Sequence, residues 1–250
     1  MNVKKEVKNI IQFVRNYYEE NHLQGAVLGI SGGKDSAVVA ALLTEALGKE
    51  NVIGFTLPCH SKEEDKIDAK VISDYYGFPL YNFDLTNVFD AFKEELTKIG
   101  QFDLETTMNS DINLKPRLRM ASLYYFAALF TAVKGKSYLV AGTSNKCELY
   151  VGYFTKGGDS VHDISLIADF TVDEVIQIGE YLKVPNQVLH KTPSDGLSNQ
   201  TDEDKLGVRY KDIANYIEGN IVAENARAKI EKLHASCQHK FAIPTYRKEK

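Results

Sequence analysis

The most chemically distinctive stretch of the chain is the hexapeptide Ser-Gly-Gly-Lys-Asp-Ser at residues 31–36. An apolar run at residues 26–30 comes before it, and an apolar run at residues 37–43 with helical character comes after it. A strand, a tight glycine loop and a helix in this order can hold a phosphate. The glycines let an anion approach the backbone, and the start of the helix offers unpaired N–H donors. We therefore expect this loop to bind the phosphates of a nucleotide.

The loop is not a Walker A loop, because Gly-x-x-x-x-Gly-Lys-[Ser/Thr] is absent, and it lacks the third glycine of a Rossmann fingerprint. Ser-Gly-Gly-x-Asp-Ser after a strand resembles the pyrophosphate loop of the ATP pyrophosphatases, which cleave ATP between the α- and β-phosphates. The alternative is a plain glycine-rich turn in which Asp35 caps the helix. The resemblance implies that ATP is bound by the loop and the two residues before it, namely Gly29, Ile30, Ser31, Gly32, Gly33, Lys34, Asp35 and Ser36.

Length and composition narrow the class of protein. The chain has 250 residues, of which 44% are hydrophobic and 26% charged, as expected for a single α/β domain over residues 1–250. No apolar run approaches the roughly 20 residues that span a membrane, and the N-terminus lacks the apolar region of a signal peptide. A net charge of −4 gives no overall attraction to nucleic acid. The three cysteines are far apart, so we expect no zinc site or disulfide and a cytoplasmic location.

Strands and helices alternate along the chain, which predicts a doubly wound α/β fold with a mostly parallel sheet. If the strand at 26–30 is central, its exit loop and that of the strand at 137–141 meet at the switch point, where ligands bind in such sheets. A capping box at Ser61 is expected to begin a helix. We expect strands at 26–30, 51–56, 80–83 and 137–141, helices at 3–21, 61–76, 86–99, 116–133, 171–182, 206–218 and 221–234, and polar linkers at 100–111 and 191–204.

The helix that we expect Pro116 to open is apolar almost all the way round. A proline is tolerated in the first turn of a helix, and a helix without a polar face is buried on more than one side. We expect one side to pack on the sheet and another on a second subunit, most simply in a two-fold homodimer. The alternative is burial by other helices of the same chain.

Further blocks make the resemblance more specific. Together with the loop, residues 113–120, 142–148, 152–163, 191–207 and 239–240 resemble the ammonia-dependent NAD synthetases and fall in family order. The resemblance implies a Rossmann-like, five-stranded adenine nucleotide alpha-hydrolase fold with helices on both faces. It also implies amidation of deamido-NAD by ammonia through an acyl-adenylate, giving NAD, AMP and pyrophosphate. The chain is too short for the amidase domain of glutamine-dependent relatives, so free ammonia is the expected nitrogen donor.

The resemblance assigns metal and ATP ligands. Asp35 and Glu148 match the family's metal ligands, and two carboxylates beside a triphosphate suit Mg²⁺. Thr143 and Ser194 match ATP contacts. The loop at 57–61 is placed near the adenosine only because it follows a strand, and a plain loop is the alternative.

The deamido-NAD site is assigned in the same way, to Arg117, Lys156, Asp163, His239 and Lys240. Cations suit its pyrophosphate and carboxylate, whereas Asp163 suits a ribose or the positive nicotinate ring. Arg117 and His239 by themselves are equally consistent with ordinary surface residues. Asp159 and Lys156 are the catalytic candidates, because a carboxylate at Asp159 can bind ammonium and accept its proton. The alternative for Asp159 is a turn residue.

The sequence departs from the family at three points. Val172 stands where many relatives have an ATP-contacting lysine, so that contact is lost or comes from another residue such as Lys156. Pro116 replaces a small residue, and Cys147 is expected to be a packed side chain.

Two other functions stay open. One is a different ATP pyrophosphatase, such as a tRNA-modifying thiolase or an amidotransferase synthetase subunit, and the other is a nucleotide-binding sensor without chemistry.

Overall fold

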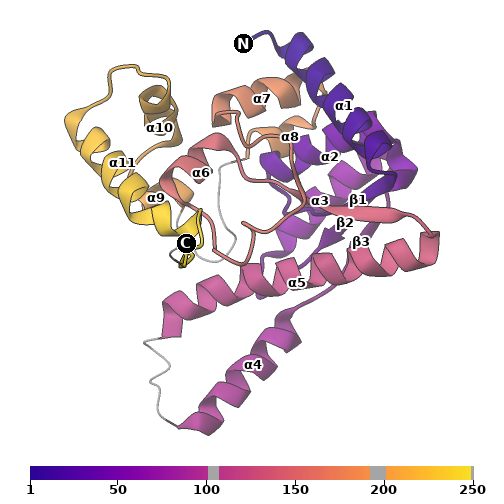
Figure 1. The fold of residues 1–250 in the computed structure, drawn as a ribbon, viewed down its shortest axis with the longest axis horizontal. Coiled ribbons are helices and arrows are strands. Elements are labelled where there is room, and N and C mark those ends of the chain that lie inside the picture. The colour runs from indigo at the N-terminus through magenta and orange to yellow at the C-terminus, as the bar shows by residue number, and fades with distance from the viewer. Residues whose placement is uncertain (101–106, 192–200, 249–250) are drawn as a thin grey trace.

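The computed structural model describes residues 1–100, 107–191 and 201–248 (Figure 1). Helices alternate with strands through the first two thirds of the chain, and the described residues of the remainder contain helices and no strand. The α-helices are α1 Val3–Glu20, α2 Lys34–Leu47, α3 Glu63–Tyr76, α4 Thr86–Ile99, α5 Met108–Lys134, α6 Lys146–Val151, α7 Val172–Tyr181, α8 Asn186–Leu189, α9 Asp202–Leu206, α10 Tyr210–Ile217 and α11 Glu224–Cys237. The strands are β1 Leu23–Gly29, β2 Val52–Thr56, β3 Leu80–Asn82, β4 Ser137–Gly142 and β5 Ile164–Ser165, and 3-10 helices occur at η1 Lys49–Asn51 and η3 Gln238–Lys240.

The strands form one five-stranded sheet in the order β3-β2-β1-β4-β5, and every neighbouring pair is parallel. β1 is therefore central, and the chain reverses direction across the sheet between β1 and β4. The predicted five-stranded, doubly wound α/β fold is confirmed, as is the meeting of the exit loops of β1 and β4. The predicted metal ligands lie in the first turns of the helices that follow those loops, Asp35 in α2 and Glu148 in α6.

Helices cover both faces of the sheet. One hydrophobic cluster joins α1, α2, α7 and α8 to one face, and a second joins α4 and α5 to the other. Figure 1 shows α5 lying across the sheet while α4 diverges from it. The whole run of residues 36–43 in α2 is buried, so this helix is held on all sides and its first turn has a fixed position beneath the phosphate loop.

A third hydrophobic cluster joins α6 to the C-terminal helices α10 and α11. In Figure 1 these C-terminal helices form a lobe beside the sheet, and the chain end returns toward α6. The lobe brings the sequence around residue 240 back to the loops that follow β4. No helix in the described parts of the chain is long and apolar enough to cross a membrane.

Four details of the predicted elements are wrong. Pro116 does not open a helix but lies inside α5, which begins at Met108, so the predicted 100–111 linker ends earlier; residues 101–106 lie outside the described ranges. Ser61 caps no helix, because α3 begins after Lys62 and has no side-chain cap. The predicted helix at 206–218 is divided between α9 and α10 at Gly207. The fifth strand, β5, and the short helix α6 occupy segments expected to be loops.

Candidate active site

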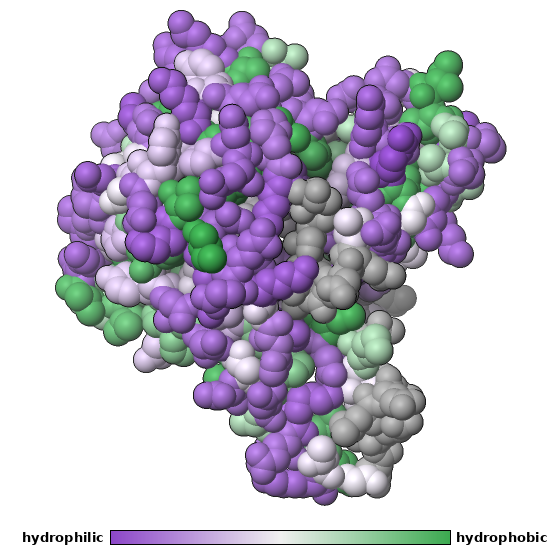
Figure 2. Space-filling model, turned by 180° about the vertical axis from the view of Figure 1, so that it is seen from behind, coloured by the Kyte–Doolittle hydropathy of each residue, from purple (hydrophilic) through white to green (hydrophobic). Residues whose placement is uncertain are grey.

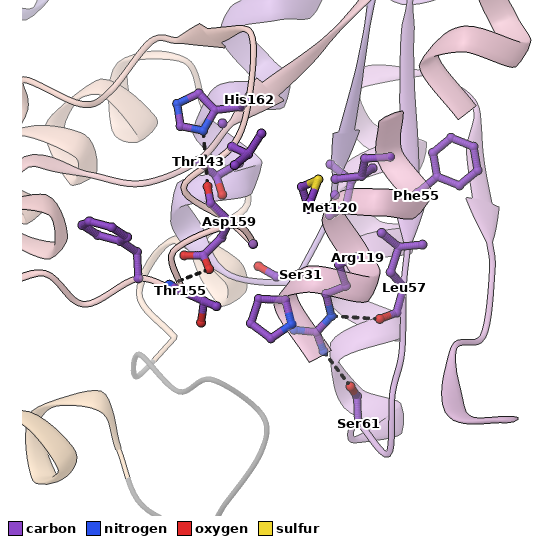
Figure 3. Close-up of a pocket in the computed structure, with 18 of the residues that line it drawn as sticks. Ser31, Phe55, Leu57, Ser61, Arg119, Met120, Thr143, Thr155, Asp159 and His162 are labelled. Atoms are coloured by element: carbon purple, nitrogen blue, oxygen red, sulfur yellow. Dashed lines mark hydrogen bonds between the residues drawn. The ribbon is translucent and has the colours of Figure 1, made fainter. Parts of the chain in front are cut away.

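A cavity of about 510 Å³ opens at the carboxyl ends of the central strands. Its volume is within the range of pockets that hold small ligands, roughly 300–1,000 Å³. The walls come from the exits of β1, β2 and β4, from the first half of α5 and from the loop at 152–162, with Lys205 and Lys240 from the C-terminal region. Figure 3 shows polar side chains of these separate elements, including Ser31, Thr143, Asp159 and Arg119, facing the same space.

The predicted phosphate loop has the backbone that its glycines require. Gly32 has a φ of +77°, and a Cβ atom at this residue would lie 2.5 Å from the carbonyl oxygen of Asp65. Gly33 precedes α2 and supplies no side-chain cap, so the N–H groups of the first turn face the loop unscreened. The Ser36 hydroxyl accepts a hydrogen bond from the Ser31 N–H and donates one to the Gly33 carbonyl, so Ser36 braces the loop from below.

The two predicted metal ligands are linked through Asn145, which is completely buried. The Asn145 side-chain amide donates to Asp35 at 3.3 Å, and its backbone N–H donates to Glu148 at 3.0 Å. Asn145 also caps α6, where its side-chain oxygen accepts from the Glu148 N–H. The structure therefore brings Asp35 and Glu148 together from the exits of β1 and β4. The alternative for Asp35 does not apply, because it caps no helix.

The charges at this point are concentrated and poorly solvated. Burial raises the pKa of Glu148 well above its usual range, and the neighbouring Asp35 carboxylate raises it further. Burial acts to lower the pKa of Lys34, but the ion pair with Asp35 at 2.9 Å outweighs it and the pKa is raised. A carboxylate pair with one ammonium group carries excess negative charge, which a divalent cation would neutralise.

These residues fit a hard cation bound jointly with a ligand. In the described ranges no cluster of three or more acidic, histidine or cysteine side chains could hold a metal by itself. Mg²⁺ in proteins is commonly held by one or two carboxylates together with substrate phosphates, which is the set that Asp35, Glu148 and the neighbouring phosphate loop would offer.

Asp159 lies on the wall of the cavity, where its Oδ1 accepts a hydrogen bond from the Thr155 N–H at 2.9 Å (Figure 3). Its side chain is exposed to the cavity, although the protein around it still removes part of its hydration. This partial burial raises the pKa of Asp159, while Lys240 and Arg119 act to lower it. A carboxylate with a raised pKa inside a cavity has the character of a general base.

Four of the five predicted deamido-NAD ligands lie together. The Arg117 guanidinium donates to the Lys156 carbonyl, and the Lys156 ammonium donates to the His239 carbonyl at 2.7 Å. Lys240 donates to the carbonyls of Gly152 and Phe154. These contacts join α5, the loop after α6 and the C-terminal region into one positively charged wall.

Asp163 instead supports the sheet. Its Oδ2 accepts from the Val140 N–H at 2.8 Å and its Oδ1 accepts from the Tyr124 hydroxyl at 3.0 Å, so it extends the pairing between β4 and β5. Burial, with the hydrogen bond to Asp163 as a smaller cause, raises the pKa of Tyr124 to about 12. The assigned ligand role of Asp163 stays a prediction.

Other predicted positions have clear locations. Thr143 lies on the cavity wall, and Ser194 is outside the described residues. Val172 is packed in the third hydrophobic cluster, whereas Lys156 lies with the deamido-NAD set. Cys147 is completely buried, and this burial raises its pKa to about 11, as expected for a packed side chain.

Two residues of the site escaped the sequence reasoning: Asn145, which is buried behind the metal ligands, and Arg119, which lines the cavity. Asn145 has a recognisable signal, because an asparagine three residues before a glutamate is the pattern of a capping box. The only sequence signal for Arg119 is its position two residues after Arg117 in the 113–120 block. It donates to the Leu57 carbonyl at 3.1 Å and to the Ser61 hydroxyl at 3.4 Å.

Comparison with known proteins decides the family. The family model described as NAD synthase matches residues 6–244. The chain belongs to the NAD synthase family. The resemblance predicted from the motifs is thereby confirmed.

Relatives of this chain include proteins named NH(3)-dependent NAD(+) synthetase. One, from Alkaliphilus metalliredigens, is 38% identical and covers 98% of both chains. Another, from Methanococcoides burtonii, is 41% identical over 86% of this chain and 79% of the relative.

Solved structures of the family have the same architecture. A structure titled NMN synthetase from Francisella tularensis is similar with a TM-score of 0.88 at 30% identity, covering 99% of both chains. An NH3-dependent NAD synthetase from Campylobacter jejuni, in complex with the nitrate ion, has a TM-score of 0.79 at 28% identity and covers 99% of this chain and 100% of the other.

Proposed function

We propose that this NAD synthase family member is a ligase that amidates deamido-NAD with ammonia at the expense of ATP, yielding NAD, AMP and pyrophosphate. The observation that carries the proposal is the link from Asp35 through Asn145 to Glu148 beside the phosphate loop. It supports an ATP·Mg²⁺ site next to a wall of cations suited to an anionic dinucleotide.

The first step activates the substrate carboxylate. One carboxylate oxygen attacks the α-phosphorus of ATP, the bond to the bridging oxygen of the β-phosphate breaks, and pyrophosphate leaves. The phosphate loop and the start of α2 hold the departing pyrophosphate through backbone N–H donors, with Lys34 beneath them. Mg²⁺ held by Asp35 and Glu148 would supply charge stabilisation for the phosphates.

The second step forms the amide. Ammonia attacks the acyl carbon, one N–H proton is lost, and the bond from carbon to the adenylate oxygen breaks to release AMP. Ammonia is mostly protonated at neutral pH, so a group that binds ammonium and takes its proton is needed. Asp159 is the carboxylate on the cavity wall that fits this role, and burial raises its pKa, which makes it a stronger base than an ordinary aspartate.

Two more assignments belong to this proposal. The loop at 57–61 and Thr143 enclose the adenosine of ATP, and both line the cavity. The positively charged wall at Arg117, Lys156 and Lys240 receives deamido-NAD. Lys156 also serves as a catalytic candidate, by orienting the carboxylate that is activated.

A two-fold dimer is part of the proposal. The inner face of α5 packs on the sheet, but its outer face leaves Tyr125 and Val133 at 67% and 70% exposure, so no described part of this chain covers it. α4 adds the exposed Phe92. The reverse side of the molecule is mostly hydrophilic with small separate hydrophobic patches (Figure 2). An apolar helix face of this kind suits a second copy of the chain.

A second candidate substrate follows from the Francisella tularensis structure, which is titled NMN synthetase. The same chemistry on nicotinic acid mononucleotide would give NMN. The two candidates differ only in the adenylate half of the substrate, so the phosphate loop, the metal ligands and Asp159 would serve either one.

The test is a product assay. The protein is mixed with ATP, Mg²⁺, ammonium and either acid, with glutamine replacing ammonium in parallel tubes. We expect NAD and AMP in equal amounts from deamido-NAD and ammonium, little product with glutamine, and a lower kcat/KM for the mononucleotide. A higher kcat/KM for nicotinic acid mononucleotide would favour the second candidate, and no amide from either acid would contradict both.

A further inference from the structure

Arg117 and Arg119 lie two residues apart on α5 and bond to two different segments of the chain. Two helical residues at this spacing point in clearly different directions. Arg117 donates to the Lys156 carbonyl on the wall assigned to deamido-NAD. Arg119 donates through Nε to the Leu57 carbonyl and through Nη2 to the Ser61 hydroxyl, on the wall formed by the exit of β2 (Figure 3). No assignment above gives Arg119 a role.

The segment that Arg119 holds needs restraint. His60 has a φ of +54°, a left-handed conformation that is costly for a residue with a side chain. On its outer side the segment is tied to α4 and the residues before it, because the His60 N–H donates to Thr86 and the Pro58 carbonyl accepts from the Leu85 N–H. On its inner side the segment is bonded to α5 through Arg119.

The hydroxyl of Ser61 connects Arg119 to the rest of this turn. It accepts from the Cys59 N–H at 3.2 Å as well as from Arg119 at 3.4 Å, so the turn and the arginine are bonded to the same atom. One planar guanidinium thus holds both ends of the turn, Leu57 and Ser61, in a fixed relation to α5. A lysine could not bridge two such acceptors with the same geometry.

We infer that Arg119 is a positioning residue for ATP: it fixes the segment at 57–61 where that segment closes over the adenosine, without touching the deamido-NAD wall. Leu57, Pro58 and Ser61 line the cavity, so a shift of this segment changes the nucleotide site directly. The inference rests on the proposed function, which places the adenosine of ATP at this wall.

The experiment compares Arg119→Met with Arg117→Met, the same substitution two residues away on the same helix. Calorimetric titration with Mg·ATP alone tests the inference, because it measures the affinity for Mg·ATP in the absence of turnover. We expect Arg119→Met to weaken Mg·ATP binding by about tenfold or more, the usual effect of losing hydrogen bonds from a charged group. Arg117→Met should bind Mg·ATP within about twofold of the wild type.

Steady-state kinetics separate positioning from general damage. Arg119→Met should raise the KM for ATP with little change in the KM for deamido-NAD, Arg117→Met should do the reverse, and Arg119→Lys should fall between wild type and Arg119→Met. Unchanged Mg·ATP binding in a folded Arg119→Met protein, or an equal rise in both KM values, would overturn the inference. If the wild type bound Mg·ATP but made no NAD, the proposed function would fail while the calorimetric comparison still decided the role of Arg119.

Discussion

At the residue scale, the account depends most on the carboxylate pair. Asp35 and Glu148 are separated by more than a hundred residues in sequence, yet Asn145 bonds to both. Glu148 is buried beside the Asp35 carboxylate, and the one ammonium group of Lys34 does not balance both charges, so a divalent ion is the natural complement of this site.

Glu148→Gln tests this pair with little structural change. A glutamine oxygen can still accept from the Asn145 N–H and keep the cap of α6, but it removes the charge. We expect loss of at least about a hundredfold in ATP-dependent activity, since a metal supplies several kcal/mol of charge stabilisation. Glu148→Ala should also fold, while losing one bond of the capping box. Activity within threefold of the wild type for either folded variant would exclude Glu148 as a metal ligand.

Asp159 makes a prediction about pH. Its pKa is raised above the ordinary value of 3.8, so activity should fall as pH decreases through the raised pKa and the base becomes protonated. Asp159→Asn should lower kcat by about a hundredfold or more, because proton transfer contributes that much, and should remove this acidic limb. Rates are compared at constant neutral ammonia concentration, so that ammonia's own titration does not enter. A retained acidic limb in the variant would assign it to another group.

The stability of the same variant follows from the sign of that shift. A raised carboxyl pKa means that the folded state binds the proton more tightly than the unfolded state. The contribution of Asp159 to the free energy of unfolding is therefore full below its pKa in the unfolded chain, and it is lost as pH rises through its pKa in the folded protein. At pH 7 Asp159→Asn should therefore unfold at the same or a higher urea concentration than the wild type. A clear loss of stability would show that the charged form is favoured by the fold.

At the element scale, the phosphate loop depends on one backbone conformation. Gly32→Ala introduces a Cβ 2.5 Å from the Asp65 carbonyl at a φ of +77°. We expect a loss of about 1–3 kcal/mol in the free energy of unfolding and weaker Mg·ATP binding.

Gly33→Ala is the matched control for Gly32→Ala. Gly33 has a φ of −102°, and an added Cβ would be no closer than 3.4 Å to its nearest neighbour. Its unfolding free energy should change by less than about 1 kcal/mol. Equal effects of the two alanines in urea titrations would contradict the loop geometry.

Much of the fold could be predicted at this scale, because it depends on long hydrophobic periodicities. The alternation of strands and helices predicted a doubly wound parallel sheet, and on the condition that β1 is central it put the exits of β1 and β4 side by side, as observed. The same topology brought Asp35 and Glu148 together, so the candidate metal site could be predicted in outline.

The errors arose where local signals compete with tertiary contacts. Pro116 is a first-turn signal, yet α5 extends before it and the cavity-lining Asn113 accepts from Thr155 of the facing loop. Ser61 has the pattern of a helix cap, but Arg119 and the Cys59 N–H take its hydroxyl. β5 has two residues and exists because Asp163 pairs with Val140, which no periodicity could reveal.

At the scale of the whole molecule, we propose that residues 1–250 act as one catalytic unit within a dimer. The sheet supplies the nucleotide end of the cavity, while the C-terminal lobe supplies Lys240 and the wall for the second substrate. The cations of that wall are bonded to backbone carbonyls in this structure, so substrate binding would exchange those bonds for phosphate contacts.

The dimer makes a prediction at this scale. Val133→Glu places a charge on the exposed outer face of α5 and should leave the monomer folded, because this side chain is 70% exposed. Burying an unpaired charge in an interface costs several kcal/mol, so the variant should be monomeric in sedimentation experiments where the wild type is dimeric. Ile221→Glu, at a site 99% exposed between α10 and α11, is the control and should remain dimeric. A dimeric Val133→Glu protein would remove this face from the interface.

The central claim is that the carboxylate is activated by transfer of AMP from ATP, and an isotope measurement tests it most directly. Deamido-NAD labelled with oxygen-18 in its nicotinate carboxylate is converted with unlabelled ATP, Mg²⁺ and ammonium, and the products are weighed by mass spectrometry. The account predicts one labelled oxygen in each AMP released, with none in pyrophosphate. Label in inorganic phosphate together with ADP, or NAD formed with unlabelled AMP, would contradict the adenylate and with it the assigned geometry of the site.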